Sequence, residues 1–182
     1  MAYEAPATVV TDEKYTAAAH NIIVGDLLAL KAIMANVVQG LKVDTQSFST
    51  SLTTFVAVTG LTATITPTSD TSKILVRAVI PVGGASSRVT GKLTGGNTAT
   101  YLGTVVGNRH AAAGYVDSNS GGLLSMNLSY LDSPATTSPI TYGVSLRTQS
   151  TDAFYVNREW TDGDNSEISR SAATIIVMEI IV

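Results

Sequence analysis

From Phe48 onward, apolar side chains recur at every second position, and clusters of Gly, Pro, Asn, Asp and Ser interrupt this alternation. A period of two is that of an extended strand with one buried face. The strands that we predict span residues 53–58, 61–66, 73–82, 88–93, 98–106, 111–116, 123–131, 140–148, 153–159 and 172–182. Short strands at this spacing, with no helix between them, predict a mainly β protein, an antiparallel β-sandwich or jelly roll.

The clearest of these strands follows a segment that holds two prolines, LDSPATTSPITYGVSLRT (residues 131–148). Pro134 and Pro139 cannot donate to a sheet ladder, and each disfavours helix in the residue before it. We therefore expect an extended turn that sets the register of the strand after it. The core-facing residues of that strand are predicted to be Ile140, Tyr142, Val144 and Leu146.

The first forty residues follow a different period. After an arm that contains Pro6, residues 11–40 are predicted to form one helix, with Thr11 as its cap and Gly40 as its end. The sequence thus divides into an N-terminal arm and helix for anchoring or oligomerisation, residues 1–42, and a β-sandwich domain, residues 43–182.

A seam of apolar residues at spacings of three and four runs along this helix. Its members are Ile23, Leu27, Leu30, Met34, Val37 and Leu41. One interpretation is that the helix packs on its own domain, as many short amphipathic helices do. The other is a self-associating or docking helix, and further apolar residues beside the seam give it a face wide enough for a three-helix bundle.

The last predicted strand, residues 172–182, is apolar on both faces apart from Glu179. Such a strand belongs at the centre of a sheet or at a subunit interface. Only 14% of the residues are charged, against 45% that are hydrophobic. A surface so poor in charge favours association, so we expect part of it to be buried against other subunits.

Several classes of function lack support in the sequence. The net charge of −3 argues against nucleic-acid binding, which needs a basic surface. The most apolar stretch, residues 22–38, is interrupted by polar residues and is too short for a membrane span. We therefore expect neither a nucleic-acid partner nor a membrane.

No catalytic, cofactor or metal motif is recognisable either. There is no cysteine, and His20 and His110 are far apart in the sequence. Asp162, Asp164 and Glu167 do not have the spacing of a calcium-binding loop and are better explained as a solvated turn. We expect a protein that is not an enzyme and that has no cofactor.

A ligand-binding role is harder to dismiss for Tyr155 and Trp160. They lie beside the polar loop 161–166 and could stack on a sugar ring. The alternative is that Trp160 closes one end of the sandwich core, which is the usual role of a large aromatic side chain.

Four segments occur in an order that resembles a known type of domain. They are FVAVTGLTATITPTSDTSKILVRAVI (residues 55–80), LSYLDSPATTSPITYGVSLRT (128–148), FYVNRE (154–159) and TIIVMEI (174–180). Together they resemble a β-sandwich domain of virion proteins of tailed phages, especially those of marine and cyanobacterial hosts. The most specific element is Asp-Ser-Pro-Ala-Thr-Thr-Ser followed by Ile-Thr-Tyr.

The resemblance implies a non-enzymatic sandwich, a homotrimer, displayed on a virus particle that assembles in the bacterial cytoplasm. It implies a capsid decoration, head-fibre or short fibre-type protein that contacts other virion proteins of the capsid or tail. The alternative is a receptor- or carbohydrate-binding tail-fibre module that recognises a host-surface glycan. The chain is short for a long tail fibre, which favours a decoration protein, a head fibre or a small adaptor.

Overall fold

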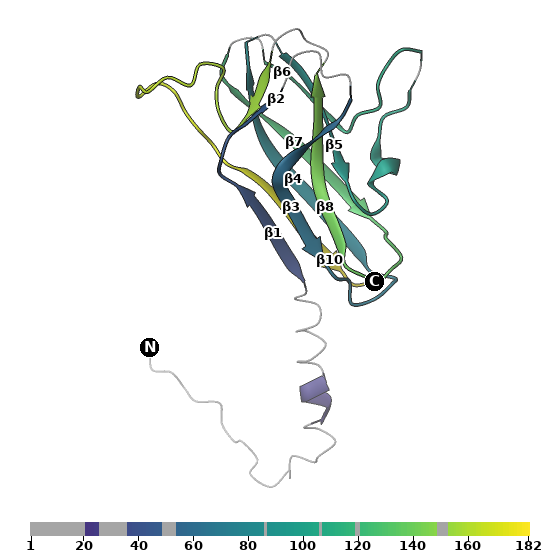
Figure 1. Ribbon diagram of the computed structural model, residues 1–182. Coiled ribbons are helices and arrows are strands. Elements are labelled where there is room, and N and C mark those ends of the chain that lie inside the picture. Colours follow the sequence, from purple (N-terminus) through teal and green to yellow (C-terminus); the bar gives the residue numbers. More distant parts are fainter. Residues whose placement is uncertain are drawn as a thin grey trace, which may run out of the picture. The chain divides into compact units, whose positions relative to one another are not determined.

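The computed structural model describes residues 21–25, 36–48, 54–85, 87–105, 107–118, 121–148 and 153–182. The chain divides into two compact units, Met1–Ala35 and Asn36–Val182. In the first unit, residues 21–25 are helical. The second unit consists of two antiparallel sheets that face each other (Figure 1), which confirms the predicted antiparallel β-sandwich.

One sheet, sheet A, has the strand order β1-β10-β4-β9-β2, with β7 also paired to β4. Its strands are β1 (Val37–Lys42), β2 (Gln46–Phe48), β4 (Lys73–Gly84), β7 (Leu123–Asp132), β9 (Phe154–Val156) and β10 (Ala173–Ile180). The long strand β4 organises this sheet. It pairs with β7 along one edge, and with β10 and then β9 along the other.

The other sheet, sheet B, has the order β3-β8-β5-β6. Its strands are β3 (Val56–Ile65), β5 (Ser87–Thr94), β6 (Gly114–Ser118) and β8 (Ile140–Thr148). The two strands predicted at 53–58 and 61–66 are one strand, β3, whose pairing with β8 shifts register between Ala57 and Thr62. Gly60 lies in this irregularity with φ of 79°, a backbone conformation that favours glycine.

The core lies between the sheets and is made by alternate side chains of their long strands. Sheet A contributes Ile74, Val76, Ile80, Ile175 and Val177, and sheet B contributes Leu61, Ile65, Tyr142, Val144 and Leu146, among others. The strand predicted at 140–148 is confirmed at its bounds, and its core-facing residues are those predicted, with Ile140 half-buried at the margin of the core.

Two sequence-based assignments of secondary structure are wrong. The predicted helix does not reach Gly40, because Val37–Lys42 form β1, which pairs with β10 over six residues. The boundary between the units therefore lies near residue 35 rather than 42. The strand predicted at 98–106 is also absent, since Thr98–Tyr101 form a 3-10 helix, η1, after a turn at Gly95 and Gly96.

The last strand lies at the centre of a sheet, between β1 and β4, as predicted. Within this chain, only one face of the strand is buried. Alternate residues of β10, such as Ile175 and Val177, enter the core, whereas Ile176, Met178 and Ile180 are exposed on the other face. One layer of core covers one face of the sheet, and no described element covers the other.

Glu179 is the one polar residue on the inner face of β10. Its carboxylate bonds to Asn36, the residue directly before β1. Its carboxylate accepts hydrogen bonds from the backbone and hydroxyl of Thr68, both at 2.7 Å, and from Asn36 at 3.4 Å. Burial raises the pKa of Glu179, but the hydrogen-bonding groups around its carboxylate, Ser72 as well as Thr68 and Asn36, outweigh burial and hold the pKa below its usual value. The buried carboxylate of Glu179 therefore has hydrogen-bond donors around it, at the end of the sandwich where β1 begins.

Candidate functional site

The predicted oligomerisation residues fall into two different environments. Ile23 is exposed in the helical stretch 21–25, and Leu27, Leu30 and Met34 lie outside the described residues. Val37 and Leu41 are in β1, where they point away from the core and are 54% and 55% exposed. These two residues therefore belong to the surface of the sandwich instead of a helical seam.

Strand register extends this surface across four strands of sheet A. Val37 lies opposite Met178, Met178 opposite Leu75, and Leu75 opposite Leu131. Leu75 is half-buried, and the other three are exposed. We call these four residues the outer apolar row. At a spacing of about 4.8 Å between strands, it is roughly 14 Å wide.

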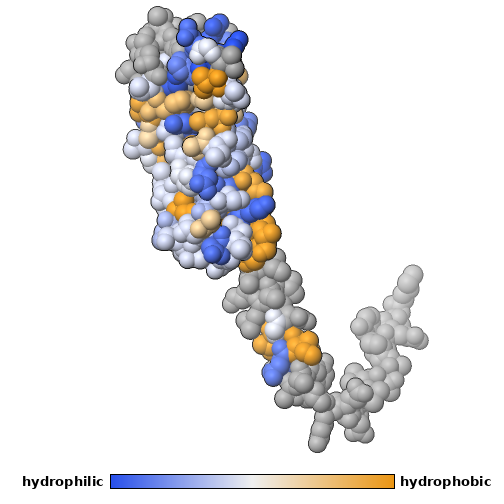
Figure 2. Space-filling model, turned by 90° about the vertical axis from the view of Figure 1, so that its right-hand side faces the viewer, coloured by the Kyte–Doolittle hydropathy of each residue, from blue (hydrophilic) through white to orange (hydrophobic). Residues whose placement is uncertain are grey.

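Along β10, exposed apolar residues continue on both sides of the outer apolar row, whereas polar residues occupy the adjacent positions of β1 and β4. Ile176 and Ile180 are exposed on either side of Met178. The next row pairs Ile176 with Gln39 and with Arg77. Figure 2 shows a strip of hydrophobic residues along the right-hand edge of the sandwich. An apolar strip with a polar margin is the usual composition of a protein–protein contact.

The second candidate site contains the two aromatic residues that the sequence singled out. The rings of Tyr155 and Trp160 are 5.7 Å apart between centroids and tilted by 59°. The guanidinium of Arg158 lies 3.4 Å from the centroid of Tyr155 and so covers one face of that ring. Trp160 is 38% exposed, so it does not close the core and presents aromatic surface to solvent.

The acidic loop beside Trp160 is held by an ion pair. Arg170 donates two hydrogen bonds to the carboxylate of Asp162, at 2.9 and 2.6 Å. The bond from Arg170 lowers the pKa of Asp162. Among the described residues, no three His, Asp or Glu side chains gather closely enough to bind a metal ion.

Two further carboxylates that could be imagined as an acid/base pair have separate partners. Asp132 is fully buried and bonded to Tyr142 and to the backbone of Asn97, whereas Glu159 accepts a hydrogen bond from the backbone of Ser169 at 3.0 Å. His20 lies outside the described residues, and His110 is on an exposed loop. None of the helices within the described residues is long and apolar enough to cross a membrane.

No protein-family model matches this chain, and no curated protein matches it. Among solved structures, a chain of the tripod (BppUct-A-L) from the baseplate of bacteriophage Tuc2009 is 12% identical, with a TM-score of 0.35. It aligns with all of this chain and with 76% of its own length.

A chain of infectious bursal disease virus, Gx strain, is 17% identical with a TM-score of 0.40, and one of the Gt strain is 16% identical with a TM-score of 0.41. This chain spans 38% of the length of each of them and is itself covered to 81%. At these identities and TM-scores, the likenesses carry no inference about the function of this chain.

Proposed function

We propose that this chain is a structural protein of a tailed-phage virion, of the capsid-decoration, head-fibre or short-fibre type. It acts through subunit interfaces and not through catalysis, and it joins the particle during assembly in the bacterial cytoplasm. The sequence resemblance of the four segments in residues 55–180 supports this role. The structural observation that carries it is the outer apolar row, which stays exposed on an otherwise well-packed sandwich.

The partner that we assign to the outer apolar row is a second copy of this chain, within a homotrimer. The mostly apolar segment 22–34 lies shortly before β1 in the sequence, and Met34 is three residues, at most about 11 Å of chain, from Val37. If the N-terminal segments of three copies associate, their β1 strands begin close together. Val37 and Leu41 of each copy are then available to the next copy.

The self-association can be tested with charges placed on this face. We expect Met178→Lys to reduce a trimer to monomers in analytical ultracentrifugation, because a buried unpaired ammonium is costly in an interface. Ser129→Lys is the matched control, since Ser129 is exposed on the same face but outside the row. A wild-type chain that is monomeric at high concentration, or a trimeric Met178→Lys variant, would contradict the assignment.

The N-terminal unit is proposed to attach the protein to other virion proteins of the capsid or tail. Residues 36–182 form a compact unit with its own core, so a chain that lacks residues 1–35 is expected to fold. This truncated chain should be missing from purified particles while giving the circular dichroism of a folded β protein. Incorporation at the wild-type level would disprove the anchoring role.

The second candidate function is that of a receptor- or carbohydrate-binding tail-fibre module. The exposed indole of Trp160 beside Tyr155 favours it, because aromatic faces stack on sugar rings. Trp160→Ala and Tyr155→Ala should then abolish binding to a host-surface glycan and leave the thermal unfolding cooperative. Unchanged adsorption to host cells by particles that carry these variants would count against it.

A further inference from the structure

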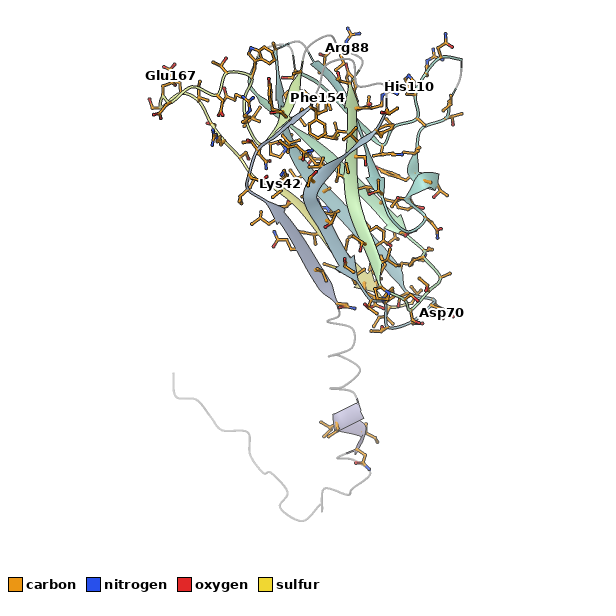
Figure 3. The ribbon with its side chains drawn as sticks, in the orientation of Figure 1. Lys42, Asp70, Arg88, His110, Phe154 and Glu167 are labelled. Atoms are coloured by element: carbon orange, nitrogen blue, oxygen red, sulfur yellow. The ribbon has the colours of Figure 1, made fainter. Side chains whose placement is uncertain are left out.

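A cavity of about 540 Å³ opens at one end of sheet B. It is lined by Arg88, Thr90, Tyr115 and Arg147 from the strands and by residues 108–110 from a loop. Figure 3 labels Arg88 and His110 at this end of the sandwich and Asp70 at the other. The volume is in the range of sites for small ligands. Tyr155 and Trp160 do not line it.

Arg147 is the most unusual residue of the cavity. It is only 3% exposed, and no hydrogen bond or ion pair joins its side chain to any residue that the structure describes. Its Nε is buried without an acceptor, and its guanidinium lies 5.7 Å from the centroid of the Phe55 ring. Burial lowers the pKa of Arg147. A buried cation that lacks a carboxylate is costly, so an arginine kept in this state indicates a negative partner.

A second unsatisfied group lies beside Arg147. Thr90 is the cross-strand neighbour of Arg147 on one side and of Tyr115 on the other. The Oγ1 of Thr90 is buried and has no hydrogen-bond partner among the described residues. The hydroxyl and the guanidinium thus offer donors to a single oxyanion from adjacent positions of one sheet.

The charge around the cavity favours an anion as well. Three of the six arginines of this net-negative chain line it: Arg88, Arg109 and Arg147. The acidic side chain next to them, Asp117, has its Oδ2 engaged by Arg88 at 3.6 Å and by the hydroxyl of Tyr115 at 3.0 Å, whereas its Oδ1 is buried without a hydrogen-bond partner among the described residues. Three guanidinium groups thus stand against this one carboxylate. In Figure 2, strongly hydrophilic residues gather at the upper end of the sandwich.

We propose that this cavity binds a sugar that carries an oxyanion, either a carboxylate or a phosphate. Arg147 and Thr90 would hold the charged group, and the fork of the guanidinium suits either oxyanion. The ring of Tyr115, which is 54% exposed, and the polar residues Asn108 and His110 surround the space left for the sugar ring. The site goes beyond the virion role and does not depend on it.

The test uses the full chain and isothermal titration calorimetry with four probes: glucuronate, glucose 6-phosphate, glucose and inorganic phosphate. At least one acidic sugar is expected to bind saturably and at least about tenfold more tightly than glucose and than inorganic phosphate. Glucuronate and glucose 6-phosphate distinguish a carboxylate from a phosphate as the preferred group.

Two variants probe the residues without removing the core. Thr90→Val keeps the shape of the side chain and removes its hydroxyl, and Arg147→Lys keeps the charge and removes the planar guanidinium. Each substitution should lower the affinity for the acidic sugar by about tenfold or more. Arg77→Gln is the matched control, because Arg77 is exposed on sheet A. Its affinity should equal that of the wild type.

Three results would overturn the proposal. The first is that neither acidic sugar binds more tightly than glucose. The second is that inorganic phosphate binds as tightly as both acidic sugars. The third is that Thr90→Val and Arg147→Lys, both shown to be folded by their thermal transitions, bind the acidic sugar with the affinity of the wild type.

Discussion

Tyr142 donates a 2.7 Å hydrogen bond to Oδ2 of Asp132, and both side chains are fully buried. Asp132 ends β7 in sheet A and Tyr142 is in β8 of sheet B, so this bond joins the two layers of the sandwich. The backbone of Asn97 also donates to the carboxylate, at 3.1 and 3.2 Å. Burial, and then the contact with Asp132, raise the pKa of Tyr142, so its hydroxyl remains a donor at any ordinary pH.

Tyr142→Phe should lower the free energy of unfolding by about 1–3 kcal/mol, because it leaves a buried carboxylate with one donor fewer. Tyr130→Phe is the matched control. The hydroxyl of Tyr130 bonds to Thr100 at an exposed position, so its loss should change the free energy by no more than about 0.5 kcal/mol. Urea denaturation measures both, and equal effects would contradict a special role of the bond between the layers.

Gly40→Ala should destabilise the sandwich by about 1–3 kcal/mol. A Cβ on Gly40 would collide with the backbone carbonyl oxygen of Thr62, so the glycine allows β1 to lie close to β3. Gly122→Ala is the comparison, since a Cβ there would meet nothing within 4 Å. We expect the thermal midpoint of Gly122→Ala to stay near that of the wild type, and a similar midpoint for Gly40→Ala would refute the close approach.

Glu179 should make the fold sensitive to acid. Its pKa in the folded protein lies below its ordinary value of 4.5, so its contribution is complete above about pH 4.5 and is lost as the pH falls through the folded pKa. Glu179→Gln should be less stable than the wild type at pH 7, and its stability should fall less between pH 5 and pH 3. The midpoints of urea denaturation at several pH values between 3 and 7 measure this dependence of stability on pH.

Asp162→Asn is the control for the acid profile of Glu179→Gln. The pKa of Asp162 is also lowered, by its bond with Arg170, but this pair lies at the surface and is screened by solvent. Its acid profile should run parallel to that of the wild type. An equal flattening by both substitutions would show that the buried position of Glu179 has no special effect.

Arg147→Met should raise the free energy of unfolding, by about 1–4 kcal/mol, although it removes a charged side chain. An apolar side chain of similar length spares the cost of a buried, unpartnered guanidinium. Arg77→Met, at an exposed site, should change stability little. A marked loss of stability in Arg147→Met would mean that its contact with Phe55 outweighs the cost of burial.

The fold was predictable where local signals agree with the tertiary structure. The prolines before Ile140 and the alternation after it predict both ends of β8 correctly, because these local signals are enough to define a strand with one face in the core. The end of the N-terminal helix was not predictable, since Val37 and Leu41 fit a helical spacing as well as an alternating one. The partner that decides between them, β10, is more than 130 residues away.

The candidate sites were less accessible to sequence analysis. Met178 and Leu75 join Val37 in one row only through the register of three strands, and no local pattern encodes that register. Tyr155 and Trp160 could be found because they are close in sequence. Arg147 is buried without a hydrogen-bond partner because of neighbours from strands distant in the sequence. The alternation in residues 140–148 predicts that Arg147 points away from the core, but it does not predict that this side chain is buried.

The central position of β10 in sheet A also determines when the domain can fold during synthesis. Its neighbours β1 and β4 are made early, yet they remain unjoined until residues 173–180 have emerged from the ribosome. Contacts at such long sequence separation slow folding and leave strand edges open in the meantime. Sheet A of a nascent chain therefore cannot close before residues 173–180 are available to pair with both neighbours.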